Sequence, residues 1–272
     1  MLNKEISISY HKVGIDSRFS TTHIHKNVLE IIQALDDNGN MVIKNKIYTL
    51  KKGALYLIDG LYPHSPAPLN KKKYQRNIII IPREYFLKIF DEMELSTVIS
   101  ELFLMNGGCF CVPNTKYCEI IDSLFYKLHK LCSVKNDPFS LLKFISHLSE
   151  LFEIAAKNQQ KNFLSVEGSV AEALEFIEKN FSENISLEKL SQNLHISKYY
   201  LCRIFKMQTG FNVSEYINLR RISLAKELLS NKSLSICYVS ASCGFNSQSY
   251  FGKLFLKYEG MSPKEYRKIY KK

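Results

Sequence analysis

The chain repeats itself near its C-terminal end, and this repeat constrains the fold more than any other feature. Residues 185–216 read ISLEKLSQNLHISKYYLCRIFKMQTGFNVSEY, and residues 234–266 read LSICYVSASCGFNSQSYFGKLFLKYEGMSPKEY. Matching residues are 49 positions apart before the central turn and 50 apart after it, so that Phe205 matches Phe255. A supersecondary unit that occurs twice in a sequence is expected to fold twice in the same way.

Each copy has the pattern of two short helices that meet at a corner. In the first copy, Ser186 and Ser197 each precede a helical segment, and serine hydroxyls cap helix N-termini. Leu201 and Phe205 then recur at helical spacing and are expected to face a core. A single match of this kind is also met in any two-helix corner, but two matched copies favour tandem helix-turn-helix units, whose second helices read the major groove of DNA.

The outer faces of the two second helices carry polar, basic and aromatic side chains. The residues predicted to contact DNA are Lys198, Tyr199, Cys202, Arg203 and Lys206 in the first unit, and Asn246, Ser247, Gln248, Ser249, Tyr250 and Lys253 in the second. Arginine and lysine can pair with guanine, and glutamine can pair with adenine. Cys202 is a poor hydrogen-bond donor, so we expect the first unit to depend more on Arg203.

A basic balance supports DNA as the partner. The net charge is +11, and residues 169–272 contain 16 Lys or Arg against 9 Glu and no Asp. Basic domains gain affinity for polyphosphates by releasing counterions. The segment 213–229 between the units is predicted to be a helix about 25 Å long. Arg220, Arg221 and Lys226 on this helix are predicted to reach phosphates.

The second unit also resembles a known family. The string Cys243-Gly244-Phe245-Asn246-Ser247-Gln248-Ser249-Tyr250-Phe251, followed by Phe255, Gly260-Met261-Ser262-Pro263 and Tyr266-Arg267, is similar to the signature of the AraC/XylS family of bacterial transcription regulators. The resemblance covers about residues 170–270. It implies that Tyr199, Cys202 and Arg203 in the first unit, and Gln248, Tyr250 and Lys253 in the second, enter the major groove. His195 departs from the pattern, because the family usually has glycine in that turn.

The first half of the chain reads as short strands. Alternating or dense apolar runs predict strands at 6–10, 28–35, 41–43, 46–50, 54–58 and 75–81, as in a β-sandwich or barrel. The family commonly joins its DNA-binding domain to a cupin-like barrel. We therefore expect a two-domain α+β protein: a cupin-like β-barrel sensor at 1–82, a helical extension at 83–157, a linker at 158–169, and an all-α double helix-turn-helix domain at 170–272.

Several polar residues of the strand-rich part resemble a cupin motif. His23, His25, Glu30 and His64 match its H-x-H…E and later His positions, and together with Tyr56 they are the candidate effector-binding residues. Three imidazoles and a carboxylate would suit a first-row metal. Metal is usually absent from regulators of this family, so we expect a small-molecule effector there, with no metal and no cofactor.

Three functions remain open at this point. The first is a regulator, not an enzyme, that binds double-stranded DNA and responds to an effector; RNA polymerase is a further candidate partner. The second is a metal-dependent cupin enzyme with an accessory DNA-binding domain. The third is a regulator without a ligand, controlled by protein contacts or abundance. Residues 115–157 form two amphipathic helices, which suit dimerisation and packing within one subunit equally well.

The location is expected to be cytoplasmic. Seven cysteines without a C-x-x-C pair suit a reducing compartment. We also expect no signal peptide, because the first residues lack an apolar segment, and no membrane span.

Overall fold

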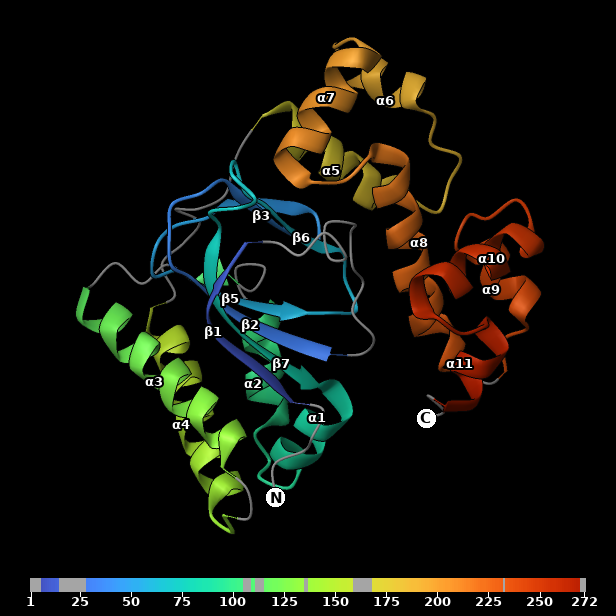
Figure 1. The fold of residues 1–272 in the computed structure, drawn as a ribbon. Coiled ribbons are helices and arrows are strands. Elements are labelled where there is room, and N and C mark those ends of the chain that lie inside the picture. Colours follow the sequence, from blue (N-terminus) through green and yellow to red (C-terminus); the bar gives the residue numbers. More distant parts are fainter. Residues whose placement is uncertain are drawn as a thin grey trace.

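The computed structural model describes residues 6–14, 28–104, 109–110, 115–134, 137–158, 168–231 and 233–269 (Figure 1). Its strands are β1 (Ser7–Val13), β2 (Val28–Ala34), β3 (Asn40–Ile43), β4 (Lys46–Thr49), β5 (Leu55–Asp59), β6 (His64–Ala67), β7 (Gln75–Pro82) and β8 (Cys109–Phe110). Its helices are α1 (Arg83–Asp91), α2 (Ser96–Leu104), α3 (Thr115–Ser133), α4 (Ser140–Lys157), α5 (Ser169–Asn180), α6 (Leu187–Asn193), α7 (Lys198–Thr209), α8 (Val213–Leu229), α9 (Ile236–Ser242), α10 (Gln248–Glu259) and α11 (Pro263–Ile269). The predicted order, a strand-rich region followed by a helical region, is confirmed.

The strands form two sheets that share one core. The larger sheet has the order β1-β7-β2-β5-β8, and the smaller has the order β4-β3-β6. Ile32, Met41, Tyr48 and Tyr56 belong to one buried cluster between them. No pairing among the described strands joins the two sheets, so the sheets are not closed into a barrel.

The central strand β2 shows why its sequence is a dense apolar run. Leu29 and Ile31 pack with the helices on the outer face of the larger sheet, whereas Ile32 and Ala34 face the smaller sheet. A strand buried on both faces needs apolar residues at successive positions. Helices α1 to α4 supply the cover on the outer face (Figure 1).

Two parts of the strand-rich and adjoining helical regions differ from the prediction. β6 (His64–Ala67) was not predicted, because Pro63, Pro66 and Pro68 are typical of turns and edge strands. β6 is indeed at the edge of the smaller sheet. The helical stretch that begins at Arg83 is broken into α1 and α2, with Glu94 between them in the left-handed region at a φ of 57°.

The helical region has its own core, and two residues of the smaller sheet belong to it. Val42 of β3 and Ile47 of β4 lie in the same buried cluster as Leu174, Phe205 and Phe211. Among the helices that the structure describes, none is long and apolar enough to cross a membrane.

Polar contacts also join the two regions. The Tyr216 hydroxyl of α8 donates a hydrogen bond to the backbone carbonyl of Lys44, in the turn between β3 and β4. Two cations lie near the Tyr62 ring: Lys44 Nζ is 4.1 Å from its centroid, and Arg220 Cζ is 5.6 Å from it. The smaller sheet therefore packs against α5 and α7, and polar contacts connect it to α8 as well.

Candidate nucleic-acid interface

The two copies of the repeat fold alike. α6 and α9 have seven residues each, and α7 and α10 have twelve each. All four helices begin at a serine whose hydroxyl accepts a hydrogen bond from the backbone N–H three residues later; these serines are Ser186, Ser197, Ser235 and Ser247. α7 and α10 both end at a left-handed glycine, Gly210 or Gly260. The predicted helix-turn-helix pair is thus present, and Ser186 and Ser197 are the caps predicted for the first unit.

The central turns of both units use a left-handed residue. His195 has a φ of 53°, and Gly244 has a φ of 83°. A Cβ atom on Gly244 would lie 2.4 Å from the carbonyl oxygen of Ser182, so only glycine fits there. His195, which is exposed, has the same left-handed backbone conformation. Histidine adopts this conformation more readily than most residues other than glycine.

The outer face of α7 is exposed. Lys198, Tyr199, Cys202, Arg203 and Lys206 are all exposed, and Tyr199 has 89% of its surface accessible. Lys198 Nζ lies 2.6 Å from Glu188 Oε1, and this hydrogen bond lowers the pKa of Glu188 below its ordinary value. The Arg203 guanidinium lies 5.6 Å from the centre of the Tyr200 ring. The face therefore presents three cations and the accessible aromatic ring of Tyr199.

The outer face of α10 is built in the same way. Its predicted contact residues are all exposed; they are Asn246, Ser247, Gln248, Ser249, Tyr250 and Lys253. The Ser247 hydroxyl already accepts a hydrogen bond from the Tyr250 N–H, so Ser247 serves first as the helix cap. Asn218 Nδ2 of α8 donates to the Tyr250 hydroxyl at 3.5 Å, which orients that phenol beside the helix start.

The prediction for the connecting helix α8 is wrong at three residues. Arg220 is buried and makes two hydrogen bonds, of 2.6 and 2.5 Å, to the Glu178 carboxylate of α5. Arg221 donates to the carbonyl oxygens of Phe181 and Glu183, which follow the end of α5. Lys226 is buried against α10. These cations hold helices together and are not directed at phosphates.

The partner of Lys226 was missed by sequence reasoning. Glu259, the last residue of α10, lies 3.1 Å from Lys226 Nζ, and the two side chains are 2% and 0% exposed. Burial lowers the pKa of Lys226, against the opposing effect of Glu259. Helical periodicity offered a signal, because Glu259 follows Phe255 by four residues and so lies on the buried face of α10.

The candidate effector residues of the strand-rich region are partly brought together. Glu30, Tyr56 and His64 are buried, and His64 Nε2 lies 3.5 Å from Glu30 Oε1. Burial opposes protonation of His64, but the Glu30 carboxylate outweighs burial, so the pKa of His64 is raised above its ordinary value. The Tyr56 hydroxyl donates to the carbonyl oxygen of Thr49.

The other two candidates, His23 and His25, lie outside the described residues. Within the described part of the chain, no three His, Cys, Asp or Glu side chains come together in a way that could hold a metal ion. Glu30 and His64 supply two such side chains.

Comparisons with known proteins agree with this geometry. Residues 190–269 match the family model described as a helix-turn-helix domain. The chain is 30% identical over 255 residues to the uncharacterized HTH-type transcriptional regulator YdiP of Escherichia coli strain K12, covering 92% of this chain and 81% of that protein. It is 32% identical over 273 residues to the melibiose operon regulatory protein of the same strain, covering 96% and 89%.

A solved structure is similar to a part of the chain. The C-terminal domain of AraT, a response regulator from Geobacillus stearothermophilus, is 31% identical, with 39% of this chain and 88% of that chain covered and a TM-score of 0.38.

Two helix-turn-helix units with exposed second helices define a DNA-binding transcription regulator. The chain belongs to the AraC/XylS family of such regulators, since the matched relatives are covered over most of their length. Because the matched relatives are named as regulators, the alternative of a cupin enzyme is not favoured.

Proposed function

We propose that this chain reads a specific DNA sequence with α7 and α10, each placed in the major groove, and that a small molecule bound in the strand-rich region modulates the reading. The proposal is carried by one observation, the matched exposure of the outer faces of the two second helices. Residues 201–210 and 251–260 share the same alternation of buried and exposed positions, apart from partly buried Gly252 opposite exposed Cys202.

The spacing of the units suits a duplex. α8 has 17 residues and is therefore about 25 Å long. Successive major grooves on one side of DNA are about 34 Å apart. Because α8 joins the end of the first unit to the start of the second, we expect it to hold the two reading helices at a separation of this order.

The side chains divide by chemistry. Arg203, Gln248 and Lys253 have the donors that recognise base edges, whereas Lys198 and Lys206 suit phosphate contacts. Asn246, Ser249 and the phenols of Tyr199 and Tyr250 add hydrogen-bonding capacity at the starts of the two helices. Cys202 adds little, because a thiol is a weak donor.

The effector part of the proposal rests on the core between the two sheets. Glu30, Tyr56 and His64 are polar groups in an otherwise apolar interior, and we propose that they line an effector site in a cupin-like sensor region. A homodimer formed through the amphipathic helices α3 and α4 is a further proposal, and so is contact with RNA polymerase.

The DNA-reading proposal is tested with two alanine variants. We expect Arg203→Ala and Lys253→Ala each to weaken binding to a selected DNA fragment by about 1–3 kcal/mol, measured by titration of the full chain at fixed salt. The fragment comes from enrichment of random duplexes by the purified protein. Lys257→Ala is the matched control, because Lys257 is an exposed cation of α10 outside the predicted set. Equal affinities of all three variants and the parent protein would refute the assignment of α7 and α10.

A further inference from the structure

The reading helices α7 and α10 differ along one row of their outer faces. Residues four apart on a helix lie on the same side, so a row of α10 is formed by Gln248, Gly252 and Leu256. The matching row of α7 is formed by Lys198, Cys202 and Lys206. The row of α7 therefore carries two cations, whereas the row of α10 carries an amide, a residue without a side chain and an apolar side chain.

Gly252 is the least expected residue of the α10 row. It lies inside a helix of twelve residues, where glycine is less stable than alanine. Apart from its chain neighbours and the helix backbone, a Cβ atom on Gly252 would have no heavy atom within 4 Å. Gly244, in contrast, has no space for a Cβ atom. Nothing in the described chain therefore requires glycine at position 252, which points to a partner that approaches the helix closely there.

Leu256 continues the uncharged row by one turn. It is 52% exposed, and the matching residue of α7 is the exposed Lys206. A single exposed leucine is common on protein surfaces, but this one lies on the face that the proposed function turns toward DNA. An apolar side chain gains nothing from a phosphate, whereas it can contact a methyl group on a base edge.

Thymine is the base that suits this row. Of the four bases, it alone presents a methyl group in the major groove, and its partner adenine presents one donor and one acceptor there. The side-chain amide of Gln248 can bond to both groups of adenine. A G·C pair offers no methyl group and would place polar base atoms against Leu256, which costs free energy.

We propose that this row recognises A·T base pairs. The methyl group of a thymine enters the space left open at Gly252 and packs against Leu256, while Gln248 pairs with a nearby adenine. Gly252 and Leu256 are then specificity-determining residues of the second unit. This inference rests on the proposed function, because it needs α10 in the major groove, and it goes further by naming the base.

The test removes single methyl groups from the DNA. Each thymine of the enriched fragment is replaced in turn by uracil, which lacks only the C5 methyl group. The full chain is then titrated with each duplex at fixed salt, with fluorescence anisotropy as the readout. At one or two positions the replacement should weaken binding about fourfold, equivalent to about 0.8 kcal/mol, the free energy of burying one methylene-sized group.

Variants of Leu256 show whether this residue receives the methyl group. Leu256→Ala should reduce the preference for thymine over uracil at those positions to less than about twofold. Leu256→Met keeps an apolar side chain and should retain the preference. Lys257→Ala is the matched control, because Lys257 is an exposed residue of α10 outside the row, and it should also retain the preference.

Gly252→Ala separates DNA contact from folding. Alanine favours the helix, so the denaturation midpoint of this variant should be higher than that of the parent protein. The added methyl group fills the open space, so binding to the thymine-containing fragment should weaken at least about tenfold. A poorly folded variant could not combine higher stability with weaker binding.

The proposal is overturned if no replacement of thymine by uracil weakens binding, or if the enriched fragment requires no A·T pair. It is also overturned if Leu256→Ala discriminates thymine from uracil as well as the parent does, or if Gly252→Ala binds DNA as tightly as the parent. Failure of the proposed function looks different, because Arg203→Ala and Lys253→Ala would then bind like the parent. If those two variants weaken binding and the methyl groups have no effect, only the present inference fails.

Discussion

The two helix-turn-helix units have nearly the same helices, but different parts of the molecule hold them in place. The first unit, α6 and α7, lies against the smaller sheet: α7 contacts β3 and β6, and a Cβ atom on Gly210 would lie 3.1 Å from the Ser65 hydroxyl. The second unit, α9 and α10, lies on α8 and α11 and is carried away from the sheets (Figure 1).

The ends of the reading helices show the same difference. In α7 the last residue is Thr209, whose buried hydroxyl donates to the Phe205 carbonyl at 2.6 Å and accepts the Phe211 N–H at 3.0 Å. In α10 the matching residue is Glu259, which forms the buried ion pair with Lys226 of α8. The residues that the two copies share therefore determine the lengths and caps of the helices. Residues that differ between the copies determine how the end of each reading helix is held.

The largest effect is expected at this ion pair. Lys226→Ala removes the lysine from beside a buried carboxylate and should lower the free energy of unfolding by about 3–5 kcal/mol. Replacing both partners, as in Lys226→Met with Glu259→Leu, should restore most of that loss. Thr209→Val in the first unit should cost only about 1 kcal/mol, because it removes neutral hydrogen bonds. Urea denaturation of the full chain measures all three.

Lys257→Ala is the control for that series, since an exposed lysine should contribute less than about 0.5 kcal/mol. A Lys226→Ala protein as stable as Lys257→Ala would show that the two units do not differ in the way their reading helices are anchored.

The two central turns are expected to differ in how much a substitution destabilises the protein. Gly244→Ala forces a Cβ atom toward the Ser182 carbonyl at a positive φ and should cost about 1–3 kcal/mol. His195→Gly removes a side chain from a strained conformation but frees the unfolded chain, so its net change should stay within about 1 kcal/mol. Denaturation midpoints of the two variants provide the comparison. A larger loss for His195→Gly than for Gly244→Ala would contradict the close approach seen at Gly244.

The smallest effect is expected at the contact between the two regions. Tyr216→Phe removes the hydrogen bond to the Lys44 carbonyl and should cost about 1 kcal/mol. Amide hydrogen exchange should accelerate in β3, β4 and α7 but not in α10, because the sheets support the first unit. Tyr258→Phe, a partly buried tyrosine of α10, is the control. Equal acceleration of amide exchange in α7 and α10 would mean that the sheets do not stabilise the first unit more than the second.

Local patterns predicted much of this fold. Serine caps and apolar spacing located α7, and the dense apolar run at 28–35 predicted the strand β2. These signals act over a few residues and so can be seen in a sequence.

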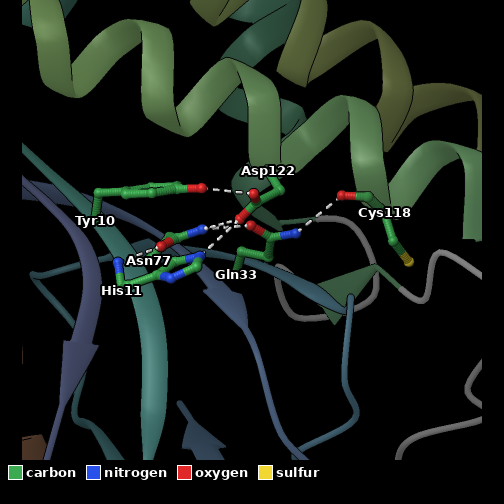
Figure 2. A network of polar contacts seen from close by, with 6 residues as sticks. All are labelled: Tyr10, His11, Gln33, Asn77, Cys118 and Asp122. Atoms are coloured by element: carbon green, nitrogen blue, oxygen red, sulfur yellow. Dashed lines mark hydrogen bonds and ion pairs between the residues drawn. The ribbon is translucent and has the colours of Figure 1, made fainter.

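The failures concern charged and polar residues whose roles depend on distant partners. Arg220 and Lys226 are residue types that often bind phosphate. In the fold, however, they are buried and paired with Glu178 and Glu259, which are remote in sequence. β1 has a bulge at Tyr10 and His11, and both side chains contact Asp122 of α3 (Figure 2). The bulge follows from its pairing with β7 and from Asp122, neither of which the sequence of β1 reveals. Exposure of the outer faces of α7 and α10 agrees with the predicted interface, while contact with DNA stays a prediction.

The places of Val42 and Ile47 inside the helical core have a consequence for how the molecule melts. The interior that supports the first unit is incomplete unless the β3–β4 hairpin is folded, so neither region can lose its structure without exposing apolar surface of the other. Heating should then produce one cooperative transition for sheets and first unit together, and a helical fragment cut away from the sheets should melt at a lower temperature than the intact chain.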